Sequence, residues 1–176
     1  MTKDLTKYTV SIYTENNIGL LNRISAIFLK RHINIESITS SQSEIDNISR
    51  FVVIVTVSKS KIKNVIKQIE KQVEVIAAFY HTDKETIYLE TALYKVKSKS
   101  LFDEKHIQKI IKKSQANIVT VSPDYFVIEK TGWRNETEEL YKSLEPYGLL
   151  QFVRSGRISV SKEPMNIRKI LNKNKD

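Results

Sequence analysis

The chain has 176 residues, 40% of them hydrophobic, and a formal net charge of +9. This length allows one large domain or two small ones, and the hydrophobic content is enough for a packed core, which excludes wholesale disorder. The absence of cysteine excludes disulfides, iron–sulfur clusters and thiolate zinc sites, and it is typical of a reducing compartment.

Targeting and membrane segments are not evident in the sequence. Residues 1–7 are polar, no signal-type apolar stretch follows, and no apolar run reaches the ~20 residues that span a bilayer. We therefore expect a soluble, cytoplasmic protein without a membrane partner. The basic charge consists of 22 lysines and only seven arginines, spread along the whole chain. Nucleic-acid surfaces draw heavily on arginine, so we expect no nucleic-acid partner.

The first half of the chain follows the order strand, helix, strand, strand, helix, strand. Alternating or β-branched segments predict the strands, and apolar residues three and four positions apart predict the helices. The predicted strands are Tyr8–Thr14, Ile33–Ser43, Arg50–Val57 and Val73–Tyr80, and the predicted helices cover Leu20–Phe28 and Ile62–Ile69.

The second half repeats this order. Its predicted strands are Ile87–Lys97, Asn117–Ser122, Tyr125–Thr131, Leu149–Ser155 and Arg157–Ser161, and its predicted helices run from about Phe102 to Ser114 and around Leu140 and Leu144. Two consecutive βαββαβ units predict an α+β protein with two ferredoxin-like domains. We place them at residues 7–81 and 85–161, and we expect residues 162–176 to form a flexible basic tail.

The segment Arg50–Val57 is apolar on both faces, whereas a strand of an open antiparallel sheet alternates. One interpretation is a central strand whose second face is covered by another subunit or domain. The other is a crowded core within a single chain. The pattern alone leaves both open.

The segment from Glu15 to Arg23 predicts a ligand site between a strand and a helix. Gly19 permits a sharp backbone turn, and the amides that follow lie at a helix N-terminus, where a carboxylate is favoured. Asn16 offers both a donor and an acceptor, which suits a ligand that carries an ammonium and a carboxylate. The alternative role for Asn16 is a turn or helix cap.

A catalytic constellation is missing from the sequence. The histidines His32, His81 and His106 are widely spaced without a metal-ligand pattern, and no phosphate loop or nucleophile motif occurs. We therefore predict no catalytic residue and no metal site. An RNA-recognition module of the same topology needs stacking aromatics on its third strand, and Arg50–Ile54 lacks the glycine and the second aromatic of that motif.

Several segments carry a resemblance to a known family. The first half resembles the ACT domain of acetolactate synthase small regulatory subunits, and the second half is similar to the C-terminal domain of that family. The segments that carry it are Glu15-Asn16-x-x-Gly19-x-Leu21-x-Arg23, Phe28–Thr39, Ser49-Arg50, Ala116–Asp124, Pro146-Tyr147-Gly148 and Val153-Arg154-Ser155-Gly156.

The resemblance implies a subunit that is not an enzyme itself. It implies that the chain binds and activates the catalytic large subunit of acetolactate synthase, which holds thiamine diphosphate, magnesium and FAD, while this chain holds no cofactor. It further implies a homodimer through the ACT domains and feedback inhibition by a branched-chain amino acid, valine first, in the biosynthesis of valine, leucine and isoleucine.

The resemblance also implies the effector-binding residues, which are Asn16, Gly19, Leu20 and Leu21 from one chain and Asn34 and Ile35 from its partner. Leu20 stands where the family often has a smaller side chain, so we expect a narrower pocket. Two other functions remain open at this point. One is a free-standing ACT-type amino-acid sensor for a different enzyme, and the other is a basic RNA-binding α+β protein.

Overall fold

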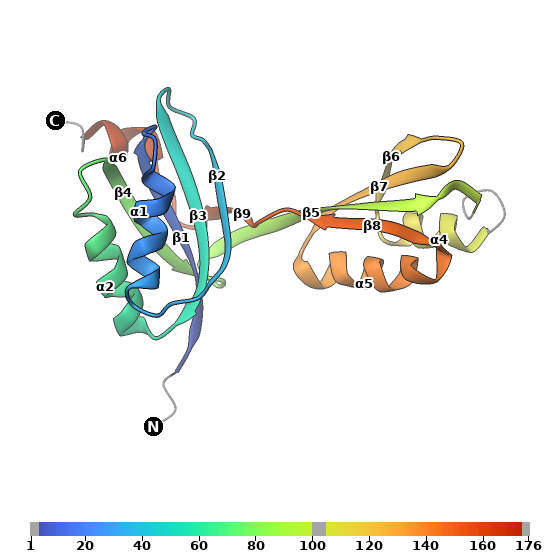
Figure 1. Ribbon diagram of the computed structural model, residues 1–176, viewed down its shortest axis with the longest axis horizontal. Helices are drawn as coiled ribbons and strands as arrows, with labels where there is room; N and C mark the ends of the chain where they lie inside the picture. Colours follow the sequence, from blue (N-terminus) through green and yellow to red (C-terminus); the bar gives the residue numbers. More distant parts are fainter. Residues whose placement is uncertain (1–3, 100–104, 174–176) are drawn as a thin grey trace. The chain divides into compact units, whose positions relative to one another are not determined.

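The computed structural model describes residues 4–99 and 105–173, which form two compact units (Figure 1). Unit 1 holds the residues up to Ile87 together with the C-terminal segment from Ser159 onward, and unit 2 holds Tyr88–Ile158. Each unit follows the order βαββαβ around an antiparallel sheet. The predicted α+β class with two ferredoxin-like units is confirmed.

Unit 1 contains a sheet with the strand order β2-β3-β1-β4, so β2 and β4 form its edges. The strands are β1 (Thr6–Glu15), β2 (Ile35–Gln42), β3 (Ile48–Val57) and β4 (Val75–Thr82), and the helices are α1 (Leu20–Leu29) and α2 (Lys59–Ile69). Alternate strand residues point at the two helices, which is the period-two rule of a pleated strand. The core between them includes Tyr8, Val10, Ile12, Ile24, Phe28, Val53, Val55, Ile62 and Ile69.

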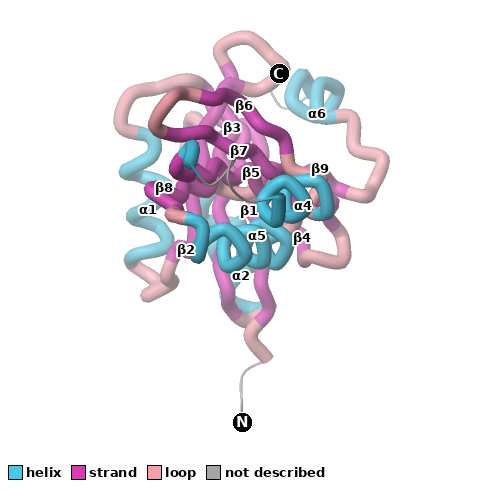
Figure 2. The backbone as a smooth tube through the Cα atoms, turned by 90° about the vertical axis from the view of Figure 1, so that its right-hand side faces the viewer, coloured by secondary structure: helices cyan, strands magenta, loops and turns pink. Residues whose placement is uncertain are grey.

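The second face of this sheet is covered by the C-terminal segment of the same chain. That segment contains β9 (Ile158–Ser161) and α6 (Ile167–Lys173), and Figure 2 shows α6 apart from α1 and α2. Leu171 of α6 is fully buried in a cluster with Tyr13, Ile48 and Ala77, whose positions alternate with those of the main core. The segment expected to be a flexible tail thus carries a helix whose apolar residues pack on the sheet.

The strand that is apolar on both faces is also buried on both faces. Val52 and Ile54 lie on the second face of β3, and both are buried within the single chain. No partner subunit is needed to remove them from water. Of the two interpretations left open by the sequence, the structure supports burial within one chain, and a dimer must be argued from other features.

Unit 2 has the strand order β6-β7-β5-β8, with β9 also pairing with β5. Its elements are β5 (Thr86–Lys97), α4 (Lys105–Lys113), β6 (Asn117–Val121), β7 (Tyr125–Gly132), α5 (Arg134–Leu144), the 3-10 helix η1 (Glu145–Tyr147) and β8 (Leu149–Arg154). The predicted helix start near Phe102 lies outside the described residues. Ala92, Tyr94, Val96, Phe126 and Ile128 form the core with the apolar residues of α4 and α5.

The predicted domain junction at residues 81–85 is a tight turn between β4 and β5. The backbone N–H of Glu85 donates to the Thr82 carbonyl at 3.0 Å, and the Glu85 carboxylate accepts from the Thr82 backbone N–H at 2.7 Å. The bond from the Thr82 backbone N–H, with another from the Thr82 hydroxyl to the same carboxylate, lowers the pKa of Glu85. Residues 82–85 thus form a hydrogen-bonded turn within unit 1, which ends at Ile87.

Candidate functional site

The loop between β1 and α1 is held in place by the strands on both sides of β1. The backbone N–H of Glu15 donates to the Glu74 carbonyl at 2.9 Å, and the backbone N–H of Asn16 donates to the Asn47 carbonyl at 3.1 Å. The side-chain oxygen of Asn16 accepts a hydrogen bond from the Ser49 hydroxyl at 3.3 Å. Among the described residues, the amide nitrogen of Asn16 donates to no acceptor. It remains available to a ligand.

Gly19 lies at the N-cap of α1 in the left-handed conformation, with φ of 81° and ψ of 0°. Residues with a Cβ rarely adopt this conformation, so the sequence needs glycine here. No side chain caps the helix, and its first turn contains no acidic residue. The first amides of α1 therefore keep free N–H groups at the positive end of the helix dipole, which suits a carboxylate.

Arg23 is paired within the site and does not offer a free charge. Its guanidinium lies 2.5 Å from the Glu74 carboxylate. Hydrogen bonding to its own backbone N–H, and then the Arg23 guanidinium, lower the pKa of Glu74. A ligand carboxylate at this loop would therefore face backbone amides, not an unpaired arginine.

The two leucines of the predicted site point in different directions. Leu20 is 2% exposed and belongs to the core beneath α1, whereas Leu21 is 45% exposed. The large side chain at position 20 thus fills the core and does not narrow the loop. Leu21 is therefore open to a ligand, as is the exposed Ile18 in the loop itself.

Asn34 and Ile35 lie at the opposite end of the sheet from the loop. Ile35 pairs with Val55, whereas Glu15 pairs with Ile48 on the same strand β3. Seven residues of extended strand separate these partners, which corresponds to roughly 23 Å. A single chain therefore does not bring the two halves of the predicted site together.

The sequence did not predict the supporting roles of Ser49, Asn47 and Glu74. Ser49 pairs with Thr14 across β1 and β3, and this register places its hydroxyl beside Asn16. Glu74 reaches the loop because β4 pairs with β1 on its other side. The only signal for Ser49 was its place in the Ser49-Arg50 pair that carries the family resemblance.

Metal binding and membrane spanning find no support in the part of the chain that the structure describes. There, no three histidine, aspartate or glutamate side chains gather in a way that could hold a metal ion. Over the same residues, no helix is long and apolar enough to cross a membrane.

The fold defines a class of protein, namely one with an ACT-type βαββαβ domain and a second ferredoxin-like domain. The family described as "AHAS small subunit-like ACT domain" matches residues 10–77, and the family described as "Small subunit of acetolactate synthase" matches residues 89–163.

Similar proteins agree with both matches. The acetolactate synthase small subunit of Mycobacterium bovis is 31% identical over 91% of this chain and 95% of its own length. That of Bacillus subtilis is 36% identical over 85% of this chain and 87% of its own length. The crystal structure of the small subunit from Thermotoga maritima superposes with a TM-score of 0.80 at 27% identity, covering 90% of this chain and 99% of that one. The chain belongs to the acetolactate synthase small subunit family. It is thus a non-catalytic, regulatory subunit in branched-chain amino acid biosynthesis.

Proposed function

We propose that this subunit senses a branched-chain amino acid, valine first among them, and passes the signal to the catalytic large subunit. The observation that carries the proposal is the uncapped N-terminus of α1 behind Gly19, which offers free amides without a competing acidic residue. The ligand carboxylate would accept from these amides, and Asn16 would hydrogen-bond the polar end of the ligand. Leu21 would contact its side chain.

A homodimer through β2 would complete the site. β2 is an edge strand, so its outer backbone groups are open to pairing with a second copy. A two-fold axis at the middle of β2 would pair the two copies antiparallel. The Ile35 end of one chain would then lie beside the Gln42 end of the other. Gln42 pairs with Ser49, whose hydroxyl donates to Asn16 of the ligand loop. Asn34 and Ile35 of the second chain would therefore approach the ligand loop of the first.

The dimer is tested by placing a charge near this axis. We expect wild type to be a dimer at micromolar concentration and Thr39→Lys to weaken it, because two lysines would then oppose each other across the axis. Like charges on facing strands cost roughly 0.2–1 kcal/mol, or up to about fivefold in the dissociation constant. Sedimentation velocity measures the change, with Ser60→Lys on α2 as a control of equal charge. A strictly monomeric wild type would contradict the proposed dimer.

The effector site is tested by Asn16→Ala in the complex with the large subunit. Losing a hydrogen bond to a charged ligand costs ~1.5–3 kcal/mol. We therefore expect the concentration of valine, leucine or isoleucine that half-inhibits the complex to rise roughly ten- to a hundredfold. Asn64→Ala on the exposed face of α2 should leave it unchanged. Equal inhibition of wild type and Asn16→Ala would place the effector elsewhere.

The open face of the sheet in unit 2 is our candidate contact for the large subunit. Leu93 of β5 and Val153 of β8 face each other across the two strands, and both are exposed. We take this pair as the centre of a candidate interaction surface, because contiguous exposed apolar patches mark such surfaces. Thiamine diphosphate, magnesium and FAD would then be held by the large subunit, which carries the chemistry.

The alternative functions considered for the sequence find less support. An RNA-binding sheet needs exposed aromatics, and Phe51 of β3 is buried in the core of unit 1. A free-standing sensor for another enzyme would not need the second domain, whose match to the acetolactate synthase small subunit covers residues 89–163.

A further inference from the structure

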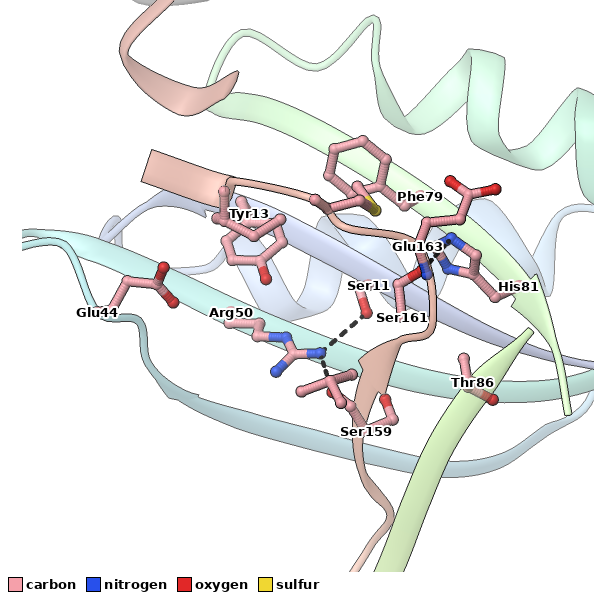
Figure 3. A pocket seen from close by; sticks show the side chains of 13 residues that line it. Ser11, Tyr13, Glu44, Arg50, Phe79, His81, Thr86, Ser159, Ser161 and Glu163 are labelled. Carbon is pink, nitrogen blue, oxygen red and sulfur yellow. Dashed lines mark hydrogen bonds between the residues drawn. The ribbon is translucent and has the colours of Figure 1, made fainter. Parts of the chain in front are cut away.

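A second candidate binding site lies in unit 1, on the face of the sheet opposite α1 and α2. A cavity of about 250 Å³ opens there between the strands and the C-terminal segment (Figure 3). Its floor includes Ser11 and Tyr13 of β1 and Phe79 of β4, and its other wall includes Ser161 and Met165. This volume is slightly below the ~300–1,000 Å³ of drug-sized ligand pockets, so it suits a small metabolite.

Arg50 places an unneutralised positive charge in this cavity. One terminal nitrogen, Nη2, donates to the Ser11 hydroxyl at 3.2 Å and to the Ser159 carbonyl at 2.6 Å, as Figure 3 shows. The Nε nitrogen is buried, and among the described residues it has no acceptor. Within the same residues, no carboxylate pairs with the guanidinium. A partly buried charge of this kind is costly unless an anion meets it, and guanidinium geometry matches a carboxylate.

The other polar groups of the cavity indicate that the ligand is not a simple anion. Glu44 and Glu163 line its rim and are exposed, so they would repel a ligand with only negative charge. They would attract an ammonium group. Burial raises the pKa of Tyr13, so its hydroxyl stays protonated and can donate to a carboxylate. Phe79 and Met165 supply the apolar part of the lining.

We infer that this cavity binds an α-amino acid with a small apolar side chain. The carboxylate of the ligand meets Arg50, its ammonium faces the carboxylates at the rim, and its side chain lies against Phe79 and Met165. The site is separate from the loop at Gly19. It also contacts both the sheet and the C-terminal segment, so a bound ligand fastens that segment to the sheet.

Ligand binding in this cavity should also change the dynamics of the C-terminal segment. Beside this cavity the segment contacts the sheet through the bond from Arg50 to the Ser159 carbonyl and the 3.4 Å contact between the Ser161 hydroxyl and His81, in addition to the pairing of β9 with β5 and the packing of α6. A ligand that bridges the two sides adds further contacts between the segment and the sheet. Hydrogen exchange of the amides in residues 159–171 slows when the site is filled.

Calorimetry with L-leucine on the full-length Asn16→Ala variant tests this site, because that variant weakens the proposed loop site. The expected result is one leucine per chain. Adding Arg50→Gln weakens this binding roughly tenfold or more. The matched control is Arg31→Gln, which removes the same charge from a guanidinium whose Nε bonds Gln68 outside the cavity, and it leaves binding unchanged. Met165→Trp fills the cavity and also abolishes binding, which covers the case in which Arg50→Gln does not fold.

Two leucine analogues, each lacking one charged group, test which groups of the ligand the cavity recognises. Isocaproate, which lacks the ammonium of leucine, binds more weakly than leucine and still depends on Arg50. Isoamylamine, which lacks the carboxylate, does not bind. The inference is overturned if the Asn16→Ala chain binds no leucine at millimolar concentration, or if its binding survives both Arg50→Gln and Met165→Trp.

These outcomes separate the two sites. If Asn16→Ala alone removes all calorimetric binding and feedback inhibition, the loop site stands and the cavity site falls. If leucine still binds the Asn16→Ala chain through Arg50, and feedback inhibition of the complex is unchanged by Asn16→Ala, the cavity site stands and the loop site falls.

Discussion

Gly19→Val is expected to weaken feedback inhibition strongly while the chain stays folded. Gly19 has a φ of 81°, and a β-branched residue at positive φ costs ~1–3 kcal/mol of backbone strain. A Cβ at this position would meet no atom within 4 Å, so the substitution adds backbone strain but no steric clash, and we expect the loop to relieve the strain by changing its backbone. The first amides of α1 then no longer point at the ligand. We expect the half-inhibitory effector concentration to rise about a hundredfold, at least as far as in Asn16→Ala.

Gly148 provides the matched control for this change. It lies in unit 2 with a φ of 80°, so Gly148→Val introduces similar backbone strain away from the loop. This variant should lose stability but keep the effector response of wild type. If Gly19→Val responds to the effector as wild type does, or if Gly148→Val loses the response equally, the amides behind Gly19 do not bind the effector.

Arg154→Met is expected to destabilise unit 2 by at most about 3–5 kcal/mol, because it leaves the buried Glu90 with the exposed Arg134, 3.9 Å away, as its remaining ion-pair partner among the described residues. The Glu90 side chain is 8% exposed and lies 3.5 Å from Nε of Arg154, whose own side chain is 13% exposed. Arg154 also donates to Glu138 at 2.7 Å and stacks over the Phe152 ring. Chemical denaturation of the full chain, monitored by circular dichroism, measures the loss.

The double variant Glu90→Met, Arg154→Met is the control for this prediction. Removing both charges leaves no buried ion unpaired, and apolar replacements of a buried pair are often neutral. We therefore expect the double variant to regain most of the stability that Arg154→Met loses. If both variants are equally unstable, the packing of the Arg154 side chain matters and its charge does not.

Local patterns were sufficient to predict the order of the elements. Period-two alternation in Tyr8–Thr14 and helical spacing from Leu20 to Phe28 are set by burial of one face, and both appear as β1 and α1. The sharp turn at Gly19 was also predictable, because a glycine between a strand and a helix usually marks a position where the backbone adopts a positive φ. The orientation of Leu20 was not predictable, because it depends on where along its length α1 begins to pack on the sheet.

Contacts between distant residues were not predictable from local patterns. Arg50 bonds the carbonyl of Ser159, which follows it by more than a hundred positions, and nothing in Ser49-Arg50 indicates that contact. The return of the C-terminal segment to unit 1 was not predictable for the same reason, since it also depends on contacts between distant residues. Its few apolar residues, such as Ile167 and Leu171, form a stripe too short to distinguish a docked helix from a frayed end.

The central claim is that the chain regulates an acetolactate synthase in response to an amino acid, and one titration tests it. The purified chain is added to its cognate large subunit, and the rate of acetolactate formation is measured with and without valine. We predict that the rate rises to a plateau near a stoichiometric ratio, and that valine lowers the plateau toward the rate of the large subunit alone. An unchanged rate and an unchanged response to valine, with a verified cognate partner, would contradict the account.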